Sequence, residues 1–135
     1  MIRKINLIII LLVCSLPFSA KASPEKELLI ENAILMNIHH EASSALGKKL
    51  NAEIVQYDCS KITDIELIRL PSGSNYLSDG HAFKLTVQMR AKVINEWKLV
   101  TMTLENDNPQ GVFISKNIQI SVIPKHYNCG KKLYP

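Results

Sequence analysis

Four histidines are the residues of this chain best suited to metal or acid–base chemistry: His39, His40, His81 and His126. His39 and His40 are adjacent and Glu41 follows them. Neighbouring residues on a helix point about 100° apart, whereas zinc-binding helices place histidines four residues apart. A shared ion would need the two distant histidines to converge on the adjacent pair. A histidine-based, metal-dependent enzyme is therefore one alternative function, although the pattern itself assigns no metal ligand, cofactor or catalytic residue.

The cysteines offer a second kind of chemistry. Cys14 lies in a leader segment that we expect to be removed, which leaves Cys59 and Cys129. These two lack the C-x-x-C spacing of redox and zinc sites, so a reactive or metal-binding pair is the weaker alternative. In an exported chain an even pair predicts a disulfide, which would remove Cys59 as a nucleophile. The bridge would close a loop of about 70 residues, for which the chain-entropy model gives a stabilisation on the order of 4 kcal/mol.

Residues 1–22 are typical of a secretory signal peptide. A short basic start and an apolar run precede the small-residue cleavage site Ala20-Lys21-Ala22. The apolar run is too short, and too interrupted by polar residues, to span roughly 30 Å of hydrocarbon. We therefore predict a secreted or periplasmic protein that keeps no membrane span after cleavage.

The charge of the mature chain differs from that of the full sequence. The full sequence has 16 basic and 12 acidic residues, a net charge of +4 and a pI of about 9.0. Three of the basic residues, Arg3, Lys4 and Lys21, lie in the leader, so residues 23–135 are nearly neutral. Bulk charge thus favours neither a nucleic-acid partner nor an anionic membrane surface. The length of this mature segment predicts a single α+β domain with one modest core.

An amphipathic helix is predicted at the start of the mature chain. Ser23 suits the N-cap, Pro24 suits the first helical position, and acidic residues follow in the first turn. Apolar residues then recur at three- and four-residue spacing, namely Ile30, Ile34, Ile38, Ala42 and Ala45. Gly47 is expected to end this helix. The resulting apolar stripe needs a partner surface.

A long β-hairpin is predicted from residue 83 to residue 105. Residues 83–93 alternate between apolar and polar types, which indicates a strand with one buried face. With Asn95-Glu96 as a two-residue turn, Ala91 lies opposite Val100 and Met89 opposite Met102. A one-residue slip would mix the two faces, so the apolar pattern constrains the register.

Three further strands are predicted over residues 52–58, 64–70 and 112–123, the last with a possible turn in its middle. The order of elements indicates an α+β fold. In this fold one N-terminal amphipathic helix packs on a curved antiparallel sheet of four or five strands, with a cystatin-like appearance.

Several segments carry a resemblance to a known family. They are the helix start Glu25-Lys26-Glu27-Leu28-Leu29, then Tyr57-Asp58 leading to residues 65–70, and the strand over residues 83–88. In these segments the sequence resembles a family of small secreted Bacillus proteins of unknown function. Asn95-Glu96 stands where that family has a His-Asn-Pro-Pro-Tyr-Gly stretch. The resemblance implies a signal peptide, one helix and an antiparallel sheet, and it implies no activity.

Trp97, Ile94 and Tyr76 form the candidate binding surface in the sequence. The expected register places Trp97 and Ile94 on the face away from the core, and an exposed pair of this kind marks contact sites. Alternatively, another strand, the loop at residues 71–80 or the C-terminal tail covers them. We predict a non-enzymatic binding protein with a protein partner, such as an inhibitor, an immunity protein or an envelope accessory. A structural subunit that assembles by strand addition is a further alternative, and it requires an unpaired edge strand.

Overall fold

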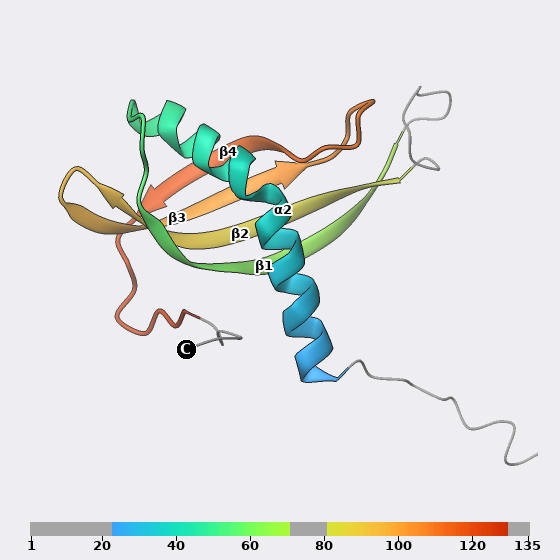
Figure 1. The fold of residues 1–135 in the computed structure, drawn as a ribbon, viewed down its shortest axis with the longest axis horizontal. Coiled ribbons are helices and arrows are strands. Elements are labelled where there is room, and N and C mark those ends of the chain that lie inside the picture. Colours follow the sequence, from blue (N-terminus) through green and yellow to red (C-terminus); the bar gives the residue numbers. More distant parts are fainter. Residues whose placement is uncertain (1–22, 71–80, 130–135) are drawn as a thin grey trace, which may run out of the picture.

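One helix and four strands make up the fold. The computed structural model describes residues 23–70 and 81–129, so the predicted leader and the loop at residues 71–80 lie outside the described part. The elements are helix α2 (Pro24–Leu50) and strands β1 (Tyr57–Arg69), β2 (His81–Val93), β3 (Glu96–Glu105) and β4 (Ile114–Ser121). The strands form an antiparallel sheet in the order β1-β2-β3-β4 (Figure 1).

The predicted α+β class is confirmed, with four strands in the described sheet. β4 is one continuous strand, without the turn that was the alternative for residues 112–123. Within the described residues, no helix combines the length and the apolar character that a membrane crossing requires.

The helix begins as predicted and ends later than predicted. Ser23 is the N-cap, and its side chain accepts a hydrogen bond from the backbone N–H of Lys26 at 3.4 Å. At the other end, Asn51 rather than Gly47 adopts the left-handed conformation, with φ 50° and ψ 47°. Gly47 lies inside the helix, where a Cβ atom would come within 2.8 Å of the Ala52 carbonyl oxygen. Its role is thus to permit a close approach of the chain that leaves the helix.

In place of the strands predicted at residues 52–58 and 64–70 the structure has one strand, β1, and residues 52–56 lie before its start. Its pairing with β2 shifts twice, between Asp58 and Lys61 and between Ile62 and Asp64. Each shift inserts an extra residue, and at the first of them Cys59 has a φ of 55°. A β-bulge interrupts the alternation of side chains, which explains why the sequence pattern suggested two separate strands.

The hairpin of β2 and β3 has the predicted faces but not the predicted register. The turn consists of Ile94 and Asn95, so Val93 lies opposite Glu96. As a consequence Met89 pairs with Val100 instead of with Met102. The difference from the predicted register is two residues, which leaves every side chain on its original face. The apolar pattern therefore could not distinguish the two registers.

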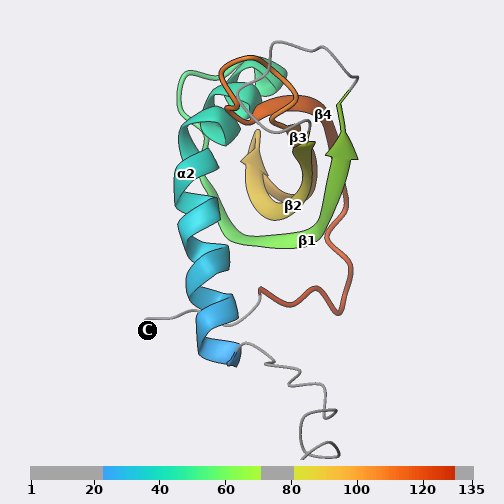
Figure 2. The same ribbon diagram turned by 90° about the vertical axis from the view of Figure 1, so that its right-hand side faces the viewer.

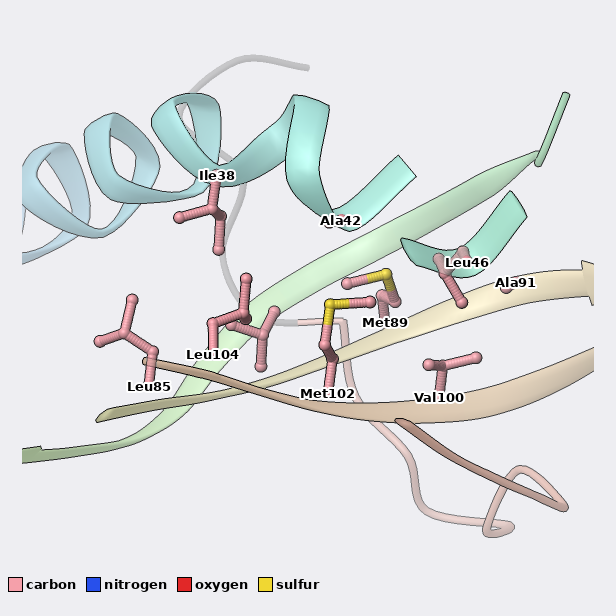
Figure 3. Packing of buried hydrophobic residues seen from close by; sticks show 10 residues of the cluster. Ile38, Ala42, Leu46, Leu85, Met89, Ala91, Val100, Met102 and Leu104 are labelled. Atoms are coloured by element: carbon pink, nitrogen blue, oxygen red, sulfur yellow. The ribbon is translucent and has the colours of Figure 1, made fainter. Parts of the chain in front are cut away.

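The core lies between the C-terminal half of α2 and one face of the sheet (Figure 3). Ile38, Ala42 and Leu46 are the buried residues of the helix. The strand residues in the core are Leu85, Val87, Met89, Ala91, Val100, Met102 and Leu104. Figure 2 shows that the N-terminal half of α2 extends beyond β1, away from the sheet. This arrangement leaves the first half of the helix without a sheet beneath it.

Candidate binding groove

The four histidines, which were the candidates for a metal site, do not gather into one in the described part of the chain. All four are exposed, and in residues 23–70 and 81–129 no three histidine, cysteine or acidic side chains come close enough to hold a metal ion. His39 contacts the phenolic oxygen of Tyr57 in β1. Glu41 accepts a hydrogen bond from the backbone N–H of Ser115 in β4, at 2.9 Å. The His39-His40-Glu41 sequence thus ties α2 to the sheet at two of its three positions.

Trp97 and Ile94 do not lie opposite one another as the predicted register had them, and both side chains are exposed. Trp97 pairs across the hairpin with Lys92, whereas Ile94 belongs to the turn and is 93% exposed. Trp97 is 43% exposed, and the guanidinium carbon of Arg90 lies 5.4 Å from the centre of its ring. Tyr76, the third predicted residue, lies outside the described residues.

Arg90 is held on this face by a bidentate ion pair. Its Nε and Nη2 atoms donate to the two carboxylate oxygens of Asp58 at 2.8 and 2.6 Å. The hydrogen bond to Asp58 raises the pKa of Arg90 above its ordinary value. Trp97 therefore packs against a cation that already has a partner, a geometry that gives cation–π stabilisation without an unpaired charge.

The segment after β4 is attached to β1 by a disulfide, as the sequence predicted. Cys59 and Cys129 are bonded, with their Cα atoms 4.7 Å apart. The Tyr127 hydroxyl donates to the Cys59 carbonyl oxygen at 3.2 Å, and burial raises the pKa of the Tyr127 phenol. Because β1 and β4 stand at opposite ends of the strand order, this segment links the two edges of the sheet.

A groove lies between the N-terminal half of α2 and β1. Its volume is about 910 Å³, and Val87 and Met89 of the core line it from β2. The helix contributes a line of residues at four- and three-residue spacing, Leu28, Asn32, Leu35 and His39. Leu29 and Met36 add exposed apolar side chains, and Met36 is 79% exposed. The lining is thus mainly apolar and open to solvent on the helix side.

Two polar contacts between α2 and β1 frame this groove. Near the hairpin end, the Tyr57 hydroxyl contacts His39 and accepts a hydrogen bond from Ser43 at 3.3 Å. Further along, the Glu31 carboxylate accepts a hydrogen bond from the backbone N–H of Ile62 at 2.7 Å. Eight residues of helix, roughly 12 Å, separate Glu31 from His39.

The bulge in β1 explains why side chains do not fill the space between these contacts. Two of the three residues that line it there, Cys59 and Ser60, are small, the third being Lys61, and Cys59 is joined to Cys129, which also lines the groove. Small side chains at the bulge leave part of the space between the helix and the strand unfilled. The opening therefore depends both on small residues in β1 and on the path of α2 beside them.

The groove was not among the sites predicted from the sequence. One signal was present, because Leu29, Ala33 and Met36 form a second apolar line on the helix, at i, i+4 and i+7, outside the stripe that packs on the core. Searches among protein-family models, curated proteins and solved structures found no match to this chain. The groove is thus interpreted from its own geometry.

Proposed function

We propose that residues 23–135 form an exported, non-enzymatic binding protein of the inhibitor, immunity or envelope accessory type. The observation that carries this proposal is the groove of about 910 Å³ between α2 and β1. Sites that bind ligands in proteins have volumes of about 300–1,000 Å³ and predominantly apolar walls with a few polar groups. The partner that this lining fits is a protein that inserts apolar side chains.

Exposed apolar surface at the groove supports this proposal. Leu29 and Met36, which line the groove, are 49% and 79% exposed. Methionine is flexible and polarisable, and it is common on surfaces that adapt to a bound partner. A partner that covered these side chains would gain on the order of 25 cal/mol for each Å² of apolar surface removed from water.

The proposed export is supported by the disulfide and by the sequence of residues 1–22. Disulfides persist in oxidising compartments outside the cytosol. The cystatin-like character of the fold and the resemblance to small secreted Bacillus proteins belong to the same proposal. Both would place a helix before an antiparallel sheet, and neither would assign an activity.

The test compares two variants that introduce an aspartate at nearby positions of the helix, Leu28→Asp and Ile30→Asp. Leu28 lines the groove, whereas Ile30 is exposed outside it and serves as the matched control. The oxidised mature chain and both variants are used to capture proteins from culture fluid and envelope extracts. A neutral fluorescent naphthylamine probe measures the affinity of the groove for apolar groups in parallel.

The proposal is supported if the amount of captured partner and the affinity for the probe both fall at least tenfold in Leu28→Asp. Both are expected to stay unchanged in Ile30→Asp. Equal capture by all three proteins would overturn the groove as the binding site. Loss of capture in Trp97→Ala with retention in Leu28→Asp would instead move the binding site to the outer face of the hairpin. No capture by the native chain would contradict the binding function itself.

A further inference from the structure

The outer edge of β1 is open over its second half. β1 is the first strand of the sheet order, and Glu31 of α2 occupies its edge only at Ile62. Residues 63–67 are all exposed. In the described part of the chain no other strand pairs with this edge. A free edge of this length is a template for pairing with another strand.

Hydrogen bonds made by Phe83 show which backbone groups of β1 point toward this edge. The Phe83 N–H donates to the Asn106 side chain at 2.6 Å, and its carbonyl accepts from the Asn106 N–H at 3.2 Å. Both groups thus point toward the end of β3, away from β1. Leu67, which lies opposite Phe83, is therefore in a pair without mutual hydrogen bonds. Its own N–H and C=O point outward, as do those of Ile65 and Arg69 two residues to either side.

The same residues carry exposed apolar side chains. Ile65 and Leu67 are 52% and 59% exposed, and Phe83 beside Leu67 is also exposed. All three lie on the face of the sheet that contains the core residue Leu85. The core cluster between the helix and that face includes Leu85, Met89 and Ala91 but none of the three exposed residues. The open edge and the uncovered apolar residues therefore coincide.

We propose that a second copy of this chain pairs with β1 in antiparallel orientation, so that two sheets join across a two-fold axis at Glu66. Antiparallel pairing of outward-pointing residues allows registers centred on residue 65, 66 or 67. The register centred on 66 places Ile65 against Leu67 on both sides of the axis. A register centred on residue 65 would place Asp64 opposite Glu66 on both sides of the axis. A register centred on residue 67 would place Ile65 opposite Arg69.

Charges on the other face limit the strength of this dimer. The axis brings the two Glu66 side chains face to face, and each is bound to its own Lys84 at 2.9 Å. Like charges directly opposite one another weaken a strand pair, while the flanking lysines keep the row neutral as a whole. The association is therefore weak, and it strengthens when the Glu66 charge is removed. This inference does not depend on the groove or on its ligand.

Cysteine cross-linking of the full mature chain tests both the dimer and its register. Under mild oxidation Glu66→Cys is expected to give a covalent dimer, because residue 66 faces its own copy across the axis. Thr63→Cys is the matched control, since its two copies would lie about 20 Å apart, six residues of strand. A dimer formed equally by both variants would overturn the register, and no dimer from Glu66→Cys would overturn the pairing.

Sedimentation equilibrium provides a second measurement that needs no oxidation. The Glu66→Gln variant is expected to dimerise several-fold more tightly than the native chain, and Leu67→Lys is expected to be monomeric. Far-ultraviolet circular dichroism confirms that each variant is folded. A monomeric Glu66→Gln at millimolar concentration, or a Leu67→Lys that associates like the native chain, would contradict the proposal.

Discussion

Glu31, on the helix, accepts a hydrogen bond from the backbone N–H of Ile62, 31 residues later in the chain, at 2.7 Å. Glu31 occupies the same helix face as Ile38, seven residues further on, so it takes a position in the apolar stripe. At that point the helix meets β1, the edge strand of the sheet, beside a bulge. The carboxylate satisfies a backbone donor that points outward from the edge strand of the sheet.

Glu31→Ala is expected to lower the free energy of unfolding by about 1–3 kcal/mol, because a half-buried N–H loses its charged acceptor. Glu31→Gln keeps an acceptor and is expected to lose less. Urea unfolding measures both values. Glu53→Ala, which removes an exposed acid outside the helix, is the control with no expected change. Equal effects at positions 31 and 53 would show that the contact does not contribute to stability.

The Cys59–Cys129 bridge spans 70 residues and joins the segment after β4 to β1. Replacing both cysteines with alanine is expected to lower the free energy of unfolding by an amount on the order of 4 kcal/mol, because the unfolded chain gains conformational entropy without the bridge. Urea unfolding with and without a reductant checks this. The reductant is expected to shift the native chain and leave the double variant unchanged; a native chain insensitive to complete reduction would refute the estimate.

Gly47→Ala is expected to destabilise the protein although alanine is favoured over glycine within a helix by about 1 kcal/mol. The reason is the Ala52 carbonyl oxygen, 2.8 Å from the position of the new Cβ atom. Thermal unfolding of Ser44→Ala, one turn earlier in the same helix, gives the comparison. A gain in stability at position 47 would show that the chain leaves the helix by another path.

Ile94→Gly is expected to stabilise the hairpin by about 1 kcal/mol. Ile94 is a β-branched residue with a φ of 60°, a conformation that glycine adopts without strain. Asn95→Gly is the informative control, because Asn95 is not among the described residues with positive φ. Stabilisation by Asn95→Gly alone would favour the turn at Asn95-Glu96 instead of the observed turn. Chemical unfolding of the two variants distinguishes these registers.

The ion pair between Glu66 and Lys84 is expected to make the stability of the protein depend on pH in the acid range. The hydrogen bond from Lys84, and its charge, lower the pKa of Glu66 below 4.5. Since the folded pKa lies below the unfolded one, this stabilisation is present above pH 4.5 and is lost as the pH falls through the folded pKa. The stability difference between the native chain and Glu66→Gln is thus expected to shrink between pH 6 and pH 3. Lys84→Met should remove the same pH dependence, and a constant difference would refute the coupling.

Local patterns in the sequence determined the start of the helix and the buried face of the hairpin. Ser23 and Pro24 predicted the helix start because capping depends on residues within one turn. The alternation over residues 83–93 predicted which side of β2 is buried, since side chains alternate along any strand. The disulfide followed from two cysteines remaining in a chain predicted to be exported.

Tertiary structure alone decided the register, the bulges and the groove. A two-residue shift of the hairpin leaves the apolar pattern unchanged, so only the turn at Ile94 and Asn95 distinguishes the registers. The bulge at Cys59 depends on the pairing of β1 with β2, which no local pattern encodes. The groove depends on where α2 leaves the sheet and on small side chains in a strand that follows it in the sequence. Such relations involve residues distant in the chain, and packing in three dimensions is what brings them together.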